Sequence, residues 1–215
     1  MTEREAMEFD VVVVGAGPAG LVTALELARH GVASTVLESE LQVSLGSRAI
    51  VFTRRTLEIL QQVGVADRMT AAGLPWRCGN SHYRGQRVFR MEAPHDADDR
   101  FFPMINLQQQ YLEQYLTEAV LAHPLIDMRW GNRVTRVDHN DGFARIEVDT
   151  PGGPYLLECD WLVAADGAIL HYANGYSDLK DASADTAPSP LYAIWGTSPS
   201  DFYVVGDRGL IQHRE

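Results

Sequence analysis

The chain opens with two apolar runs separated by a helical pattern. The unbroken β-branched run from Val11 to Val14 predicts a strand buried on both faces, as in a parallel sheet. After a glycine-rich turn, apolar residues recur at the spacing of one helix face: Leu21, Ala24, Leu25 and Ala28. Gly31 is placed to end this helix, and a second strand over 35–37 closes on Glu38. The pattern predicts a strand–helix–strand unit.

Two further helices and a hairpin are predicted beyond this unit. Residues 41–53 have the composition of a loop, and a helix over 54–63 follows, with Thr53 as its N-cap and Gly64 just beyond its end. Short alternating segments around "YRGQR" predict a β-hairpin over 76–93. A longer helix over 108–123 presents one apolar face, formed by Leu112, Tyr115, Leu116, Ala119 and Val120.

The second half of the chain is rich in strand patterns. Segments 133–137, 143–150 and 155–158 are joined by "HNDG" and "PGGP", which predicts a three-stranded meander. A buried strand over 161–165 then runs into Asp166-Gly167. From residue 169 the composition changes: "DASADTAPSP" is typical of a linker, and "LYAIWG" and "DFYVVGDRG" predict two short strands. We expect one domain over 1–168, with a small β insertion at about 76–105, and a divergent tail over 169–215.

Net charge, hydropathy and the spacing of cysteines and histidines argue against several classes of function. The 215 residues carry a net charge of −11, which argues against a nucleic-acid partner and against a basic membrane-surface helix. No apolar run approaches the roughly 20 residues of a membrane span, and the charged N-terminus has no signal-peptide core. Cys78 and Cys159 lack zinc-type spacing, and the histidines are scattered, so no metal site is expected. A cytoplasmic location follows as the default.

The glycine-rich turn has the spacing of a dinucleotide-binding motif, Gly15-x-Gly17-x-x-Gly20. Gly15 permits the tight turn out of the strand, Gly17 lets the backbone approach a pyrophosphate, and Gly20 lets the helix lie close to the sheet. Pro18 suits the first helical position, where the free N–H groups attract phosphate. Glu38 is placed to accept hydrogen bonds from a ribose. An ordinary strand–turn–helix with a solvated acid is the alternative, and the motif alone does not separate NAD from FAD.

Four segments in order resemble one family. "DVVVVGAGPAGLVTALELARHGVASTVLE" is similar to the N-terminal fingerprint of glutathione-reductase-type FAD proteins. "GSRAIVFTRRTLEILQQVGV", "INLQQQYLEQYL" and "CDWLVAADGA" resemble segments of aromatic-ring flavoprotein monooxygenases, the para-hydroxybenzoate hydroxylase-like enzymes, especially their hydroxyphenylpropionate hydroxylase-like branch. The resemblance implies an α/β fold: a Rossmann-like FAD-binding domain with a three-stranded β-meander.

The resemblance also implies which residues contact FAD. The turn Gly15, Gly17, Pro18, Ala19 and Gly20 would face the pyrophosphate, and Glu38 the adenosine ribose. Arg48 would lie beside the pyrophosphate and ribityl chain, Gln109 would contact the ribityl chain, and the Val134 backbone would contact the adenine. Asp166 and Gly167 would lie near the phosphates, in a motif that the family also links to NAD(P)H use.

Some of these residues have simpler interpretations. Arg48 is also read as a solvated loop arginine, and Asp166 as a turn residue at a strand end. Asn106 and Gln109 have the spacing of a capping box, in which Asn106 is the N-cap and Gln109 reaches back to its N–H. Both roles of Gln109 are compatible.

The chemistry implied by the resemblance is hydroxylation of a small aromatic substrate with NAD(P)H and dioxygen, and FAD carries the reaction. No side-chain nucleophile is needed, and we identify no catalytic residue. The sequence departs from the family at "DGAILHYANG", and the substrate domain is largely missing from these residues. We therefore expect weak FAD binding and poor hydroxylation by this chain alone. A non-catalytic dinucleotide-binding module and, less favoured, an NAD-dependent dehydrogenase are the alternatives; the oligomeric state stays open.

Overall fold

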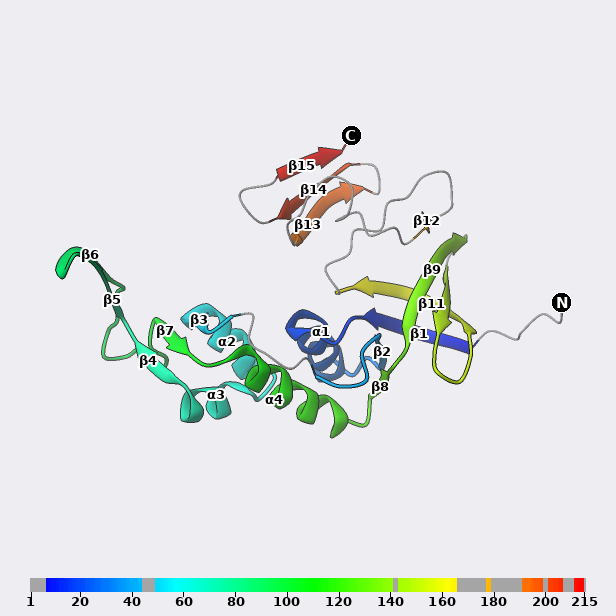
Figure 1. Cartoon of the computed structure of the whole chain (residues 1–215). Coiled ribbons are helices and arrows are strands. Elements are labelled where there is room, and N and C mark those ends of the chain that lie inside the picture. Colours follow the sequence, from blue (N-terminus) through cyan, green and yellow to red (C-terminus); the bar gives the residue numbers. More distant parts are fainter. Residues whose placement is uncertain are drawn as a thin grey trace.

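The computed structural model describes residues 7–43, 49–140 and 143–165, and the strand segments 177–178, 191–198, 201–206 and 211–214. Its largest element is a seven-stranded sheet with the order β12-β9-β10-β11-β1-β2-β8 (Figure 1). These strands are β1 (Met7–Val14), β2 (Ser34–Glu38), β8 (Ile126–Trp130), β9 (Arg133–Asn140), β10 (Phe143–Asp149), β11 (Tyr155–Ala164) and β12 (Ser177–Asp178). The predicted α/β fold is confirmed.

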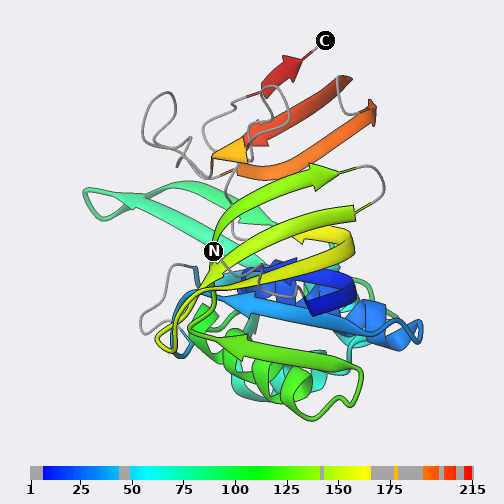
Figure 2. The ribbon, with the colours of Figure 1, turned by 90° about the vertical axis from the view of Figure 1, so that its right-hand side faces the viewer.

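The strands in one half of the sheet are parallel, and those in the other half are antiparallel. Strands β11, β1, β2 and β8 run parallel, whereas β12, β9, β10 and β11 pair antiparallel (Figure 2). The predicted meander therefore joins the strand–helix–strand unit in a single sheet, because β11 pairs with β1 along most of its length. The expected separate strands over 155–158 and 161–165 are one strand, β11. The expectation that its second part is buried is wrong: Trp161 is 72% exposed, Ala164 is exposed as well, and Leu162 and Val163 are half-buried.

Helices cover one face of the parallel strands. Helices α1 (Pro18–Arg29) and α4 (Gln109–Leu121) pack on each other and on this face, next to α2 (Arg54–Gln62) and α3 (Ala66–Ala72). Successive side chains of a strand point to opposite faces of the sheet. Val13 and Val36 therefore pack in the core next to the helices, and Val12 and Leu37 pack in a second core formed with the meander. The β-branched run is thus buried on both faces, as its pattern predicted.

Short-range sequence signals correctly predicted helices α1, α2 and α4. The buried face of α1 consists of Gly20, Leu21, Ala24, Leu25 and Ala28. Thr53 caps α2, and its hydroxyl accepts from the backbone N–H of Thr56 at 3.4 Å. The expected loop over 41–53 ends instead in a short strand, β3 (Val51–Thr53), which pairs with β7 (Met104–Asn106) beside β4 (Leu74–Trp76). The sequence pattern predicted neither α3 nor β8.

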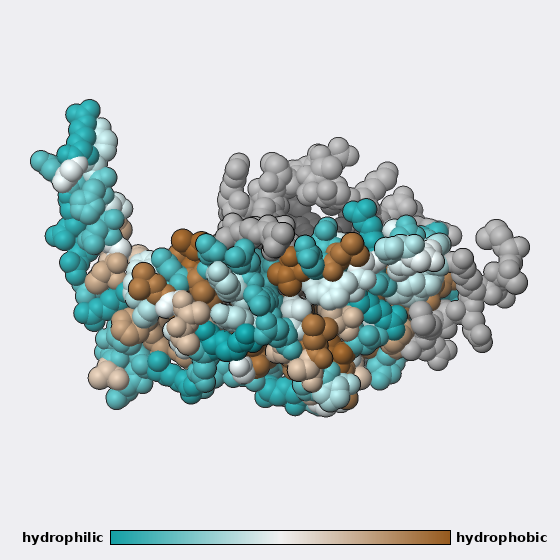
Figure 3. Space-filling model, turned by 60° about the horizontal axis from the view of Figure 1, so that its bottom comes forward, coloured by the Kyte–Doolittle hydropathy of each residue, from teal (hydrophilic) through white to brown (hydrophobic). Residues whose placement is uncertain are grey.

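The predicted hairpin is present as β5 (Cys78–Tyr83) and β6 (Gln86–Glu92). Arg84 and Gly85 both have positive φ, at 48° and 78°, as a two-residue hairpin turn requires. Figures 1 and 3 show the hairpin projecting from one end of the molecule. The two expected tail strands correspond to β13 (Leu191–Ser198) and β14 (Asp201–Gly206), which form a separate sheet with β15 (Ile211–Arg214).

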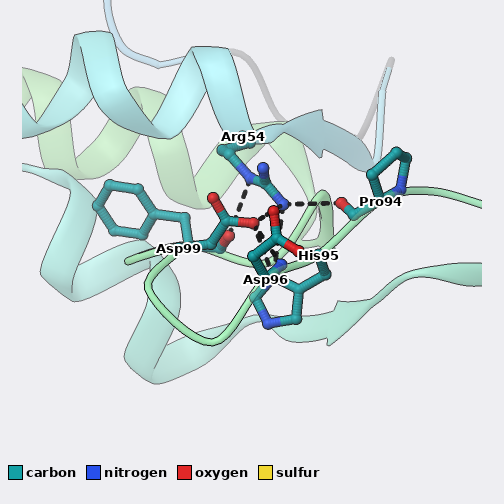
Figure 4. A network of polar contacts seen from close by, with 6 residues as sticks. Arg54, Pro94, His95, Asp96 and Asp99 are labelled. Carbon is teal, nitrogen blue, oxygen red and sulfur yellow. Dashed lines mark hydrogen bonds and ion pairs between the residues drawn. The ribbon is translucent and has the colours of Figure 1, made fainter.

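An arginine joins the segment after this hairpin to α2 (Figure 4). The Arg54 guanidinium donates to the carbonyls of Phe101 at 3.1 Å and Pro94 at 2.9 Å, and it pairs with Asp99 at 2.9 Å. The backbone N–H of Asp96 lowers the pKa of Asp99 most, and the charge of Arg54 lowers it further. Residues 94–101 are therefore held against the domain by a hydrogen-bonded ion pair.

Candidate functional site

The carboxyl ends of the parallel strands meet in one row. Val14 of β1 pairs with Leu37 of β2 and Ala164 of β11, and Glu38 pairs with Trp130 of β8. Helix α1 leads into β2, and α4 leads into β8. Each helix runs antiparallel to the strand that follows it, so the N-termini of both helices lie at this same edge. In open α/β sheets, ligands bind outside the carboxyl ends of the strands, which makes this edge the candidate site.

The three motif glycines meet different local requirements. Gly15 has a φ of 100°, a conformation that favours glycine. At Gly20, an added Cβ would lie 2.0 Å from the carbonyl oxygen of Gly15, so the close contact of α1 with the turn excludes any side chain. Gly17 has an ordinary extended backbone, with φ −69° and ψ 174°, and an added Cβ would meet no atom within 4 Å among the described residues. The described residues therefore do not require glycine at position 17.

The N-terminus of α1 is open to an anion. Gly17 is the N-cap, Pro18 occupies the first turn, and Ala19 follows it. Among the described residues no side chain caps this helix, and no acidic residue lies in its first turn. The first N–H groups of a helix lack intrahelical partners and carry partial positive charge, so this turn has the electrostatics of a phosphate site.

Glu38 is bound to the glycine turn. Its Oε2 accepts a hydrogen bond of 2.7 Å from the backbone N–H of Ala16, and its Oε1 accepts from the backbone N–H of Glu40 at 2.9 Å. The alternative of a purely solvated acid is wrong, because the carboxylate joins the end of β2 to the turn after β1. Each carboxylate oxygen has more than one lone pair, so Glu38 retains acceptor capacity for a sugar hydroxyl.

Gln109 begins α4 at the same edge as the glycine turn. Its backbone N–H donates to the carbonyl of Ala49 at 3.0 Å, and its side-chain Nε2 donates to Glu113 Oε1 at 2.6 Å. Glu113 was not among the residues expected at the site. The available signal was the spacing of four residues between the amide and the acid on a helix, which brings both side chains to one face.

The capping-box alternative is wrong. The N-cap of α4 is Gln108, and it makes no side-chain capping hydrogen bond. Asn106 belongs to β7, and its Oδ1 accepts from Trp76 Nε1 at 2.6 Å. Trp76 lies on β4, thirty positions earlier in the chain, so the residues next to Asn106 in the sequence do not reveal this contact.

Val134 lies close to the end of β2. The turn between β8 and β9 is fixed there, because the backbone N–H of Asn132 donates to the carbonyl of Glu38 and that of Gly131 to the carbonyl of Glu40, each at 2.8 Å. Val134, the second residue of β9, therefore lies near Glu38, and its side chain packs against the meander core. Arg48, Asp166 and Gly167 lie outside the described residues.

The described ranges were compared with the requirements of a metal site and of a membrane-spanning helix. Across residues 7–43, 49–140 and 143–165, no three His, Cys, Asp or Glu residues are grouped so that they could hold a metal ion. None of the helices in these ranges has the length and apolar character to cross a membrane.

Known proteins resemble this chain over most of its length. Residues 8–170 match the family described as FAD binding domain. A para-nitrophenol 4-monooxygenase of Pseudomonas sp. (strain WBC-3) is 34% identical over 162 residues, which are 74% of this chain and 40% of that protein. A 3-(3-hydroxy-phenyl)propionate/3-hydroxycinnamic acid hydroxylase of Mycobacterium sp. (strain JLS) is 26% identical over 166 residues, 77% of this chain and 29% of that protein.

A solved structure shares the architecture. The crystal structure of the p-nitrophenol 4-monooxygenase PnpA from Pseudomonas putida DLL-E4 matches with a TM-score of 0.71 and 25% sequence identity, and the match covers 96% of this chain and 57% of that one. The chain thus spans less than two thirds of the length of each of these three proteins.

Proposed function

The chain belongs to the FAD binding domain family, as its motifs indicated, and on this premise we propose that it binds FAD at the carboxyl edge of the sheet. We propose further that it acts as an FAD-dependent monooxygenase of a small aromatic substrate, or forms the FAD-binding portion of one. NAD(P)H and dioxygen are the proposed co-substrates, and the cytoplasm is the proposed location. The names of the matched relatives, which describe monooxygenation and hydroxylation of aromatic compounds, support this activity.

The observation that carries FAD binding is the open space at Gly17. Glycine is unnecessary there for the backbone, and among the described residues no atom fills the place of a side chain. A diphosphate approaching the uncapped N-terminus of α1 needs that space. A bound diphosphate would account for the absence of a side chain at Gly17, for which the described residues give no other reason.

The proposed contacts follow the edge of the sheet. The turn from Gly15 to Gly20, including Pro18 and Ala19, faces the diphosphate, and Glu38 accepts from the adenosine ribose. The Val134 backbone lies against the adenine, and Gln109 lies at the ribityl chain. Arg48, Asp166 and Gly167 complete the proposed set. We also propose that the binding unit extends over 1–168, with 76–105 as an insertion and 169–215 as a tail.

FAD would supply the redox chemistry, and the residues of this chain would bind and orient it. The alternative of an NAD-dependent dehydrogenase is less favoured, because the chain continues from β8 into the antiparallel strands β9, β10 and β11 and not into further strand–helix units. A non-catalytic FAD-binding module would have the same FAD site, so a measurement of hydroxylation activity is needed to distinguish it from a monooxygenase.

Visible absorption of the purified full chain tests the proposal. The protein is expected to bind added FAD up to a one-to-one ratio at saturation in equilibrium dialysis, with the low affinity expected from the sequence, and the flavin absorption bands are expected to shift on binding. A colourless protein that ignores added FAD would falsify the proposed function. Consumption of NAD(P)H with a panel of phenols then separates two cases: hydroxylated product indicates a monooxygenase, and bound FAD without product indicates a binding module.

Replacing Glu38 by alanine is expected to weaken FAD binding by about tenfold to a hundredfold. The reason is the loss of one charge-assisted hydrogen bond to a ribose hydroxyl, which contributes about 1.5–3 kcal/mol. The substitution also removes the acceptor of the Ala16 N–H, so the FAD-free protein should melt at a slightly lower temperature. Titration of FAD fluorescence and thermal unfolding without FAD measure the two effects. An unchanged dissociation constant would remove Glu38 from the site.

A further inference from the structure

The hairpin of β5 and β6 has a free edge on each strand. Among the described residues, the two strands pair only with each other, so the outer edge of each meets no further strand. All seven residues of β6 are exposed, whereas Cys78 and Gly79 at the start of β5 are partly buried. A two-stranded hairpin is marginally stable by itself, and a free edge is a template for pairing with another chain. The more open of the two edges is that of β6.

One face of the hairpin is apolar as well as exposed. Phe89 is 60% exposed and Met91 is 39% exposed, and alternation along β6 places both side chains on the same face. A Cβ added at Gly79 would lie 3.6 Å from the ring of Trp76 and 3.7 Å from the methyl group of Met91, so this apolar face extends to the base of the hairpin. Figures 1 and 3 show that the hairpin projects away from the body of the protein.

The hairpin is cationic, although the protein is acidic. Residues 76–93 contain four arginines and one glutamate, a net charge of +3, whereas the whole chain carries −11. Two of these arginines pair with Glu92 at the base of the hairpin. Arg84 and Arg87 lie at its tip, and none of the ion pairs found within the described ranges includes either of them. The tip therefore carries positive charge that a partner can compensate.

The charge changes sign from one end of the hairpin to the other. Arg84 and Arg87 mark the start of β6, and the segment that follows the strand contains Asp96 and Asp98. Neither aspartate belongs to an ion pair in the part of the chain that the structure describes. A second β6 running antiparallel would bring the cationic tip of each hairpin to the acidic segment of the other. A parallel arrangement would bring like charges together.

We propose that the free edge of β6 pairs with β6 of a second copy of this chain, antiparallel about a two-fold axis, so that the two hairpins form one continuous sheet. A two-fold axis perpendicular to the sheet keeps the same face of both hairpins on one side. Phe89 and Met91 of both copies then form a single apolar row, and the backbone groups of both edges gain hydrogen-bond partners. The acidic segment of each copy receives the arginines at the tip of the other.

Sedimentation velocity of the full chain without FAD, at rising protein concentration, tests this inference. A species of twice the chain mass is expected to replace the monomer, and added salt should weaken the association because exposed charges are screened. Hydrogen exchange at the same concentrations locates the contact. The amides of β6 should gain protection as the dimer forms, while those of α1 should exchange at an unchanged rate.

Two substitutions on β6 test the apolar face and the charge separately. Phe89→Lys places a charge in the apolar row and should weaken dimerisation roughly a hundredfold. Arg87→Glu should weaken it about tenfold, since an attraction becomes a repulsion at both ends of the interface. Arg55→Glu on α2 is the matched control, because Arg55 is exposed, pairs only with the nearby Glu58 among the ion pairs of the described residues, and its substitution changes the net charge equally. It should leave dimerisation unchanged.

A mixture of two variants keeps the test decisive if a substitution disturbs the hairpin itself. R87E alone and D96K/D98K alone should both associate poorly, because like charges then meet at both ends of the interface. When the two variants are mixed, opposite charges face each other again at both ends. The mixed dimer should therefore form with an affinity within about threefold of the wild type.

Several results would overturn the inference. One is a wild-type chain that stays monomeric up to its solubility limit, and another is protection of β6 that does not depend on protein concentration, which would indicate a segment of the same chain on this edge. Equal dimerisation of Arg87→Glu and Arg55→Glu would place the interface elsewhere. Failure of the mixed variants to associate would exclude the antiparallel arrangement, and a monomer that assembles only with added polyglutamate would assign the edge to an acidic partner.

Discussion

Alanine at position 17 is expected to lower the affinity for FAD by about tenfold to a hundredfold while the FAD-free protein stays folded. The backbone of Gly17 is extended, with a φ that any residue adopts, and among the described residues an added Cβ contacts nothing within 4 Å. The new methyl group would instead enter the space at the N-terminus of α1 that the diphosphate needs. Forcing a methyl group into an occupied space typically costs about 1–3 kcal/mol.

The stability of the Gly17→Ala protein should change little. Alanine is a poorer N-cap than glycine, by roughly 1 kcal/mol, which corresponds to a fall of about 2–4 °C in melting temperature for a domain of this size. Fluorescence titration with FAD and thermal unfolding of the FAD-free protein measure the two quantities separately. Wild-type affinity in Gly17→Ala would show that the diphosphate does not lie against this turn.

Alanine at position 20 is expected to give the opposite result, a net loss of about 2 kcal/mol in the free energy of unfolding before any ligand is added. An added Cβ would lie 2.0 Å from the Gly15 carbonyl oxygen, 3.1 Å from the Gly15 carbonyl carbon and 3.3 Å from the Cβ of Ala165. The first two atoms belong to the backbone, so relief requires α1 to move away from the turn. Overpacking of this kind costs about 1–3 kcal/mol and sometimes more.

The gain in helix propensity from glycine to alanine, about 1 kcal/mol, offsets only part of that cost. A fall of roughly 4–8 °C in melting temperature, or a clear shift of the urea midpoint, is therefore expected for FAD-free Gly20→Ala. Gly17→Ala is its matched control, because the same methyl group is added three residues earlier. Equal melting curves for Gly20→Ala and the wild type would contradict the close helix–turn contact.

The elements that the sequence predicted well are those with a local cause. The β-branched run at 11–14, the apolar face of α1 and the Thr53 cap each depend on residues within one or two turns of one another. The same holds for the hairpin turn at Arg84 and Gly85, where backbone conformation alone sets the geometry.

The elements that it missed have distant partners. Strands β3, β4 and β7 have three residues each, too few for a periodic pattern, and they exist because they pair with one another across the chain. Strand β8 is defined by its register with β2. The helix-cap alternative for Asn106 is wrong because the side-chain partner of Asn106, Trp76, lies on another strand.

The glycine turn, the strand–helix–strand unit, the acid that closes it and the family resemblance could all be predicted from the order of residues, because each depends on short-range spacing. Three further features become visible in the folded chain: Glu38 binds the turn after β1, α4 begins beside α1 at the same edge of the sheet, and Glu113 is buried against Gln109. The reason is physical: strand register and the burial of both sheet faces are set by contacts between residues far apart in the chain, and those contacts bring the proposed cofactor residues together.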